Sequence, residues 1–243
     1  MTLQEIIDNS NKIVFFGGAG VSTESGIPDF RSANGIYNDK TFEEEFGADP
    51  EYLLSSFALY GDTEKFYKFH RSLILSPNNG PNTAHKKLVE LENAGKLSSI
   101  ITQNIDGLHQ EAGSKNVIEL HGNAHSYRCI QCSKKYDDSI FDGHPELDYI
   151  PRCTCWAIVR PEIVLYGENL DDDALNRAID EISSCDTLIV AGTSLTVYPA
   201  AGLVKYFRGK HFVIINKSWT PFDDSCDLKI SDSIGKVLGE IKV

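Results

Sequence analysis

The sequence lacks a long hydrophobic run and a secretory signal. No apolar stretch in its 243 residues approaches the roughly 20 residues that a membrane-spanning helix needs. The first residues, from Met1 to Ile7, contain no basic region that leads into an apolar one, which a secretory signal would require. We therefore expect a cytoplasmic protein without a membrane partner.

Basic residues are also scarce. The chain has 23 lysine and arginine residues against 35 aspartate and glutamate residues, so its formal net charge is −12. Binding to nucleic acid relies on clustered basic side chains that neutralise phosphates, so we expect no nucleic-acid partner. An acidic surface could attract basic protein segments, but solubility alone is the simpler explanation of this charge.

Repeats and low-complexity segments are absent as well. Hydrophobic residues make up 41% and charged residues 24% of the chain, as is ordinary for a globular enzyme. The length suits one α/β core with inserts, which can bury a large interior without disulfides. We expect a monomer.

Four of the six cysteines lie close together in the sequence, and the other two stand alone. The four are spaced as Cys129-x-x-Cys132, twenty residues, and Cys153-x-Cys155. In a reducing compartment, two close pairs at this separation favour a zinc ribbon over disulfides. Four thiolates would leave no open coordination position, so the zinc would be structural.

Apolar runs alternate with amphipathic stretches along most of the chain. The runs predict strands over residues 13–16, 97–102, 117–120, 163–166, 187–191 and 212–215. Helical periodicity predicts a short first helix around Leu3, Ile6 and Ile7, and others over 83–94, 171–184, 198–207 and 233–241. Gly95 would cap the helix over 83–94. This alternation indicates an α/β fold with a Rossmann-like, doubly wound parallel sheet.

Two inserts interrupt this core. Residues 41–75 are acidic and aromatic with a helical period, follow a loop-like stretch over 32–38, and end at the breaker-rich segment 76–81. We assign a helical insert to residues 32–80 and a zinc-binding insert to residues 125–157, which together form a smaller domain. The core domain is then discontinuous and comprises residues 1–31, 81–124 and 158–243.

The first predicted strand leads directly into Gly18-Ala19-Gly20 and an expected helix start. Glycines at such a turn let the backbone approach a pyrophosphate, and the helix N-terminus presents amide donors to it. The dehydrogenase fingerprint is broken, because Thr23 occupies its third glycine position. The segment Pro28-Asp29-Phe30-Arg31 follows and could form a flap over the reactive end of a dinucleotide.

Polar clusters also follow other predicted strands, namely Gln103–Asp106, His121, Gly192–Ser194 and Asn216. Asn and Asp after a strand are usually turn formers, and a lone His is more often structural than catalytic. In a doubly wound sheet, however, the carboxyl ends of the strands line one crevice. Five strand ends that converge there predict a single site.

The stretch from Gly18 to Arg31 is similar to the sirtuin signature G-A-G-x-S-x-x-S-G-I-P-D-F-R and matches it at every specified position. Further motifs follow in the family's order: Thr102–Asp106, His121-Gly122, the cysteine cluster, Arg160-Pro161, Tyr166–Glu168, Gly192–Ser194 and Asn216. The resemblance covers nearly the whole chain. It implies an NAD-dependent protein-lysine deacetylase whose core domain binds NAD.

The resemblance implies cofactor contacts from Gly18, Ala19, Gly20, Ser22, Thr23, Asp29, Phe30, Arg31, Gln103, Asn104, Ile105, Asp106, His121, Gly192, Thr193, Ser194, Asn216, Lys217 and Ser233. Gln103 would bind the nicotinamide ribose, and Ile105 and Asp106 the carboxamide. Asn104 would hold an ordered water or the ribose. Phe30 would shield the face that nicotinamide vacates.

The implied catalytic residues are His121 and Asn104. The acetyl oxygen of an acyl-lysine attacks C1′ as nicotinamide leaves, and His121 then deprotonates a ribose hydroxyl, which attacks the imidate carbon. An unperturbed imidazole pKa near 6.5 suits such a base. Hydrolysis releases lysine and O-acetyl-ADP-ribose. The reaction needs an aligned acyl oxygen and exclusion of water.

An acyl-lysine peptide would lie extended between two segments and pair with them as an added strand. The implied substrate contacts are Val164, Tyr166, Gly167, Glu168, Leu195, Val197 and Tyr67. Taken singly, each segment could equally be an ordinary strand or loop.

The acyl preference rests on the helical insert. Sirtuin-like enzymes that prefer succinyl-lysine have a Tyr and, three residues later, an Arg on one helix face. Here Tyr67 matches the Tyr, but His70 replaces the Arg, and Arg71 is rotated by about 100° around the helix. Tyr67 could also merely pack, with His70 in solvent. Without a cation in the pocket we expect acetyl-lysine to be preferred.

One feature departs from the family pattern: Cys153-x-Cys155 is one residue shorter than usual and cannot form the normal knuckle turn. We still predict zinc on all four thiols. Two other functions stay open, a protein mono-ADP-ribosyltransferase and a non-catalytic NAD-sensing module. Retention of His121, Asn104 and Asp106 speaks against the sensing module, because binding alone needs no ribose base.

Overall fold

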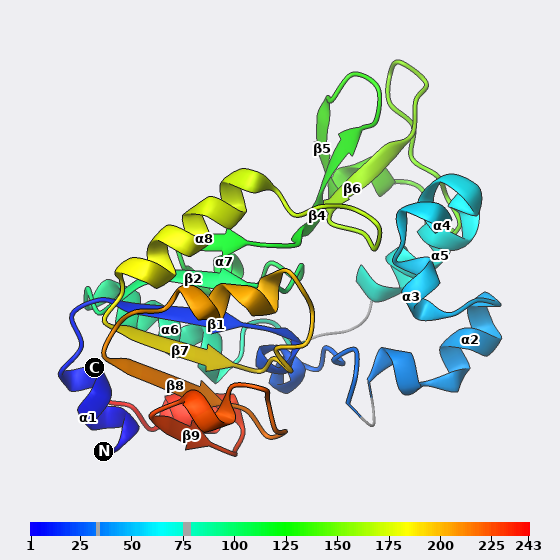
Figure 1. Ribbon diagram of the computed structural model, residues 1–243. Coiled ribbons are helices and arrows are strands. Elements are labelled where there is room, and N and C mark those ends of the chain that lie inside the picture. Colours follow the sequence, from blue (N-terminus) through cyan, green and yellow to red (C-terminus); the bar gives the residue numbers. More distant parts are fainter. Residues whose placement is uncertain (33–34, 75–78) are drawn as a thin grey trace.

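The computed structural model describes residues 1–32, 35–74 and 79–243, without the side chains of Phe42, Glu43 and Ile74. A larger part contains a six-stranded sheet between two layers of helices. A smaller part contains short helices and a three-stranded antiparallel sheet (Figure 1). Within the described ranges, no helix is long and apolar enough to span a membrane.

The large sheet is entirely parallel, with strand order β3-β2-β1-β7-β8-β9. Its strands are β1 (Ile13–Gly17), β2 (Leu97–Thr102), β3 (Val117–Glu119), β7 (Thr187–Ala191), β8 (His211–Ile215) and β9 (Leu228–Ile230). All residues of β1, β7 and β8 are buried, because helices cover both faces of the sheet. The predicted doubly wound sheet is confirmed. The prediction missed β9, a short and half-buried edge strand.

Helices cover both faces of this sheet (Figure 1). On one face, α1 (Leu3–Asp8), α6 (Thr83–Asn93) and α9 (Ile234–Gly239) pack against Ile13 and Phe15 of β1. On the other, α8 (Asp172–Ser184) and the 3₁₀ helix η5 (Ala200–Tyr206) pack against Val14 and Phe16. Alternate residues of a strand face opposite sides, so β1 contributes to both cores. The short helix α7 (Leu108–Ala112) follows β2.

Local capping explains where these helices begin and end. The Asn82 side chain accepts a hydrogen bond from Ala84 N at 2.9 Å at the start of α6. Gly95, with φ of +71°, follows the C-cap residue Ala94 and closes this helix as predicted. Asp171 caps α8 by accepting from Ala174 N at 2.9 Å. The predicted positions of both helices are confirmed.

Two expected helices are 3₁₀ turns instead. After β1 the chain forms η1 (Ala19–Val21) and η2 (Thr23–Ser25), and Gly26 ends η2 with φ of +89°. The helix start expected after the glycine turn is therefore wrong, because left-handed Gly26 stops the coil before an α-helical turn can continue. The helix expected over 198–207 is η5, where Gly202 N donates to Pro199 O, three residues back.

The helical insert contains η3 (Ile36–Asn38), α2 (Lys40–Phe46), α3 (Pro50–Leu53), α4 (Ser56–Gly61) and α5 (Thr63–Ile74). Phe46 packs on Phe69 and Phe66 on Tyr67, all of them buried, which confirms the predicted aromatic packing for these residues. Phe57, expected in the same cluster, is instead 74% exposed. Part of the predicted breaker segment, residues 76–78, lies outside the described residues, as do residues 33–34 of the predicted loop.

The small sheet has the order β5-β4-β6 and consists of β4 (Gly122–Cys129), β5 (Lys135–Asp137) and β6 (Val159–Ile163). The 3₁₀ helix η4 (Asp138–Phe141) follows β5, and η6 (Asp223–Ser225) precedes β9. The strand predicted over 163–166 is wrong. The strand ends at Ile163 and pairs with β4, and only Tyr166 beyond it forms an isolated bridge, with Ser55.

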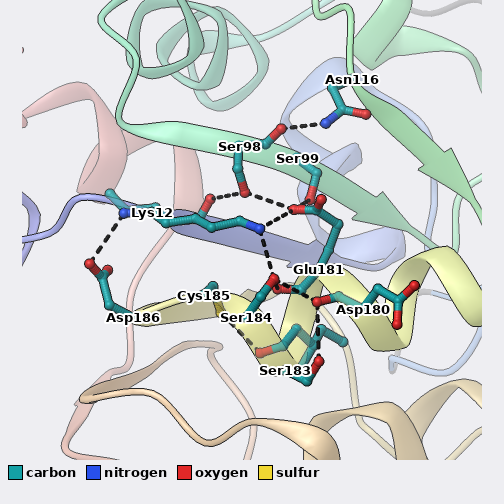
Figure 2. A network of polar contacts seen from close by, with 12 residues as sticks. Lys12, Ser98, Ser99, Asn116, Asp180, Glu181, Ser183, Ser184, Cys185 and Asp186 are labelled. Atoms are coloured by element: carbon teal, nitrogen blue, oxygen red, sulfur yellow. Dashed lines mark hydrogen bonds and ion pairs between the residues drawn. The ribbon is translucent and has the colours of Figure 1, made fainter.

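A polar network joins the amino ends of the central strands to α8 (Figure 2). Glu181 of α8 lies 3.3 Å from Lys12 Nζ and accepts hydrogen bonds from Ser98 Oγ at 3.0 Å and Ser99 Oγ at 3.2 Å. Asp186 accepts from the Lys12 backbone N–H at 3.2 Å. This network lies at the opposite end of the sheet from the predicted crevice, so its role is stability.

We predict that Glu181→Ala lowers the free energy of unfolding by about 1–2 kcal/mol, because Lys12, Ser98 and Ser99 each lose a polar contact in a partly buried setting. Denaturant unfolding measures this. Glu90→Ala, which removes an exposed Lys87 partner on α6, is the control and should change the free energy by less than about 0.5 kcal/mol. Equal effects of the two substitutions would contradict the prediction.

Candidate active site

The two glycine turns at the centre of the sheet contact each other backbone to backbone. Strand order reverses between β1 and β7, so a crevice is expected at their carboxyl ends. Gly20 N donates to Gly192 O at 2.8 Å. A Cβ on Gly18 would lie 2.8 Å from Gly192 O, and one on Gly20 would lie 2.7 Å from Gly192 Cα. These glycines are needed for the turns to meet, whatever binds above them.

Hydrogen bonds join the residues after β1 to those after β2. Asn104 Nδ2 donates to Ser22 Oγ at 3.0 Å, and Ser22 Oγ donates to Asp106 Oδ2 at 2.6 Å. The Gln103 side chain donates to Thr193 Oγ1, after β7, at 3.1 Å. Five predicted site residues from three strand ends therefore interact directly.

His121 follows β3 and lies beside this group. Its Nδ1 is 2.8 Å from the backbone oxygen of Gln103, which can only accept, so Nδ1 carries the proton and Nε2 has the free lone pair. Burial lowers the pKa of His121, and the bond to Gln103 partly opposes this. The imidazole is therefore neutral at pH 7 and can accept a proton at Nε2.

Hydrogen bonds hold the predicted flap, residues 28–31, in place. Asp29 Oδ1 accepts from Arg31 N at 3.0 Å and from Ser32 N at 2.7 Å. Tyr37 N donates to Phe30 O at 3.0 Å, and the two rings lie 5.5 Å apart. The Tyr37 hydroxyl is 2.7 Å from the Tyr166 hydroxyl. Sequence reasoning missed Tyr37, because only contacts across the chain connect this loop tyrosine to the predicted peptide segment.

Three of the predicted cofactor contacts, Asn216, Lys217 and Ser233, lie after β8 and before α9. Asn216 N donates to Ile230 O at 3.0 Å, and Lys217 O accepts from Ser231 Oγ at 3.0 Å. Ser233 precedes α9, whose Gly235 N donates to Glu24 of η2 at 2.8 Å. Ser233 is thus brought near the turn that contains Thr23. The Ser194 hydroxyl contacts that of Thr196 at 2.7 Å.

Two of the predicted substrate contacts are already engaged within the protein. Glu168 forms a bidentate pair with Arg160, at 2.5 and 2.9 Å. The Leu195 side chain is buried in the core under β7, so only its backbone could face a peptide. Val164 N donates to His121 O at 2.9 Å, which holds the 164–168 segment against the base. Val197, like Val164, is half-buried.

Tyr67, His70 and Arg71 of α5 are all buried. Tyr67 is fully buried and its hydroxyl donates to the Val159 carbonyl, so this hydroxyl already has a partner within the small part. His70 is buried and stacked on Phe66, not in solvent, and burial lowers its pKa to about 3. The Arg71 guanidinium donates to the His144 and Glu146 carbonyls.

The four clustered cysteines converge, with all four sulfur atoms within 4.8 Å of one another. Cys129 Sγ is 3.4 Å from Cys155 Sγ, and Cys132 Sγ is 3.5 Å from Cys153 Sγ. Tetrahedral zinc with Zn–S bonds near 2.3 Å needs sulfurs about 3.8 Å apart, so the donor set fits zinc.

The two pairs form different turns. In the first pair, the Gln131 and Cys132 amides both donate to Cys129 Sγ at 3.4 Å. In the shortened pair, Trp156 N donates to Cys153 O at 2.8 Å, and Trp156 adopts a left-handed φ of +71°. This tight turn lets one intervening residue bring both thiols to the cluster.

Comparison with known proteins gives a consistent result. The model of the Sir2 family matches residues 18–199. A protein from Clostridium perfringens named NAD-dependent protein deacetylase is 55% identical over 241 residues, covering 98% of this chain and 96% of that protein. One of the same name from Clostridium acetobutylicum is 51% identical over 238 residues, covering 97% and 95%.

Solved structures agree with these matches. A Sir2 structure with a p53 peptide and NAD+ is 40% identical and has a TM-score of 0.79, with coverage of 98% of this chain and 96% of that one. A Sir2 homolog in complex with NAD is 38% identical and has a TM-score of 0.84, with coverage of 98% and 90%. The family match over residues 18–199 and the relatives that are more than 50% identical along nearly the whole chain show that this protein belongs to the Sir2 family.

Proposed function

We propose that this protein is an NAD-dependent protein-lysine deacetylase, which transfers the acetyl group to ADP-ribose and releases nicotinamide. The proposal is carried by His121, which is neutral and has a free lone pair at Nε2. It lies beside the hydrogen-bonded group of Ser22, Asn104 and Asp106 at the carboxyl ends of the central strands. The relatives named above, which span almost the whole chain, support it.

NAD would lie across the carboxyl ends of the strands. The turn from Gly18 to Thr23 would hold the phosphates, because its glycines let the backbone approach a pyrophosphate closely. Gln103, Asn104 and Asp106 would bind the half that carries nicotinamide, next to His121. Residues after β8 and before α9 lie farther along the same edge, so Asn216, Lys217 and Ser233 would contact the other half.

The chemistry would proceed in two stages. The acetyl oxygen of the acyl-lysine bonds to C1′ of the ribose as the bond to nicotinamide breaks. His121 Nε2 then accepts the proton of a ribose hydroxyl, whose oxygen attacks the acyl carbon, and addition of water frees the lysine amine. Phe30 and the flap would exclude water from the exposed sugar carbon.

The four cysteines would hold one structural zinc ion. All four coordination positions are taken by thiolates, so the metal would stabilise the small sheet and would not touch substrate. We also propose the domain division stated above, with the second insert over residues 125–157; the small sheet itself runs from residue 122 to 163. The protein would act on peptides as a cytoplasmic monomer.

We predict that His121→Ala loses deacetylation but still binds NAD, because the base is removed and the glycine turns are untouched. Mass spectrometry of an acetyl-lysine peptide incubated with protein and NAD measures the activity, and calorimetry measures NAD binding. His125→Ala, which removes an exposed imidazole paired with Asp138, is the control. Full activity of the His121 variant, or deacetylation without NAD, would contradict the proposed mechanism.

The lowered pKa of His121 sets the acid limb of the pH–rate profile. A base with a lowered pKa stays neutral to a lower pH, so kcat/KM should stay level from pH 8 to below 6.5 and fall only beneath that. A fall in kcat/KM that already begins at or above pH 7 would contradict the assignment of His121 as the base.

We predict about one zinc per chain in protein purified without added metal. Removal of the zinc should speed amide hydrogen exchange in β4, β5 and β6 much more than in β1 and β7, because the cluster joins only the small sheet. Cys226→Ser, outside the cluster, should retain the metal. Zinc-free protein with an unchanged small sheet would show that the shortened pair holds no metal.

We predict that kcat/KM for acetyl-lysine exceeds that for succinyl-lysine in the same peptide by about tenfold or more, because a buried carboxylate would lack a cationic partner. Arg71 is held by two carbonyls, and His70, with a pKa of about 3, stays neutral. Desuccinylation should therefore not improve between pH 8 and pH 6. A clear succinyl preference at pH 8 would mean that another cation reaches the acyl group.

A further inference from the structure

The flap and the segment assigned to the substrate peptide meet at two tyrosine hydroxyl groups. The hydroxyl oxygens of Tyr37 and Tyr166 lie 2.7 Å apart, the ordinary distance of an O–H···O hydrogen bond. The two residues are 129 positions apart in the sequence, and both side chains are half-buried. This bond therefore joins two parts of the site that no local sequence signal connects.

The backbone of Tyr37 is fixed to the flap. Tyr37 N donates to Phe30 O at 3.0 Å. One residue earlier, Ile36 N donates to Asp29 O at 2.8 Å, so the start of η3 pairs with the flap. Gly35 permits this approach, because a Cβ there would lie 2.7 Å from the carbonyl carbon of Phe30. A displacement of Tyr37 therefore displaces Phe30 as well.

Two flap side chains also contact this tyrosine pair. The ring centroids of Phe30 and Tyr37 lie 5.5 Å apart. The guanidinium carbon of Arg31 lies 5.5 Å from the centroid of the Tyr37 ring, and Arg31 Nη2 donates to the Tyr166 hydroxyl at 3.4 Å. The flap thus contacts the pair through both Phe30 and Arg31.

Tyr166 is held by contacts that do not involve the flap. Its N–H donates to Leu54 O at 2.9 Å, and its carbonyl accepts from Ser56 N at 3.0 Å. Two residues earlier, Val164 N donates to the His121 carbonyl at 2.9 Å. The phenol ring therefore extends from a backbone that is fixed against both the helical insert and the residue proposed as the base.

The Tyr37 hydroxyl keeps its proton at any pH at which the enzyme would act. Burial raises the pKa of Tyr37, and the hydrogen bond to Tyr166 raises it further. One neutral hydrogen bond shifts an equilibrium between a held and a released flap by about threefold to tenfold. The bond is thus strong enough to change how often the flap is held, although the fold does not depend on it.

The position of the flap matters because two nucleophiles compete for C1′ of NAD. In deacetylation, the acetyl oxygen bonds to C1′ as the bond to nicotinamide breaks. If water reaches C1′ instead, its oxygen forms the bond, the electron pair of the broken bond leaves with nicotinamide, and a proton passes to solvent. The products are then ADP-ribose and nicotinamide, and the acetyl-lysine is unchanged.

We propose that Tyr37 and Tyr166 are positioning residues whose hydroxyl bond holds the flap, with Phe30, against the 164–168 segment while the acetyl oxygen reacts. Held in this way, the flap keeps water from C1′. The inference rests on the proposed deacetylase function and adds to it the residues that couple NAD cleavage to deacetylation.

The test measures free ADP-ribose against O-acetyl-ADP-ribose at early times, with radiolabelled NAD and a saturating acetyl-lysine peptide. Tyr37→Phe and Tyr166→Phe each remove one hydroxyl and keep the ring. Each should raise the ratio of ADP-ribose to O-acetyl-ADP-ribose about threefold to tenfold. The double variant should raise it no further, because either substitution alone already breaks the bond.

A second measurement needs no NAD. The amide groups of Ile36 and Tyr37 bond to the flap, so their hydrogen exchange reports its release. Both amides should exchange about threefold to tenfold faster in either variant than in the unmodified protein. Tyr52→Phe is the control, because it removes a hydroxyl bonded to Asp62 at 2.8 Å in the same insert. It should change neither the exchange nor the product ratio.

Two results would overturn the proposal. One is a product ratio that stays unchanged in either tyrosine variant, as a merely structural role would leave it. The other is an effect of the two substitutions that adds in the double variant, since the hydroxyls would then act separately. Failure of the proposed function looks different, because the unmodified protein would not deacetylate the peptide at all.

Discussion

The site depends on the contact between two glycine turns at the centre of the parallel sheet. Gly18 and Gly20 approach Gly192 so closely that any Cβ would collide with backbone atoms. Backbone atoms cannot yield as a flexible side chain can, so the contact sets the spacing of the β1 and β7 ends. Ser22 and Thr193 directly follow these turns, so the contact between the turns also fixes where these two residues lie. The polar groups after β2 bond to both.

His121 connects the two parts of the molecule. Its ring is oriented by the Gln103 carbonyl of the large part, while its own carbonyl accepts from Val164 of the peptide segment. The strand that leads to the cysteine cluster begins at the next residue. Order in the small sheet therefore supports the position of the base. The Glu181 network stabilises the amino ends of the central strands, where no predicted site residue lies.

Much of this architecture could be predicted from local sequence. A strand buried on both faces must be apolar throughout, so the central strands stood out as short apolar runs. Helical periodicity marked the helices over 83–94 and 171–184, and Gly95 marked the end of the first, because glycine readily adopts the left-handed conformation that closes a helix. The cysteine spacing predicted a cluster, and the motifs after the strands predicted one site. These signals are local, because each reflects chemistry within a few residues.

Tertiary structure alone decided features that depend on partners far along the chain. Tyr67 and His70 are polar residues on an amphipathic helix, but their burial follows from packing against the small sheet, including the Val159 carbonyl. The pairing of Tyr166 with Ser55, not with the large sheet, likewise needed both segments in place. The sequence by itself determined the central strands of the large sheet, the helix end at Gly95 and the motifs that follow the strands. Burial and pairing were settled only in three dimensions, because they belong to contacts between segments and not to either segment alone.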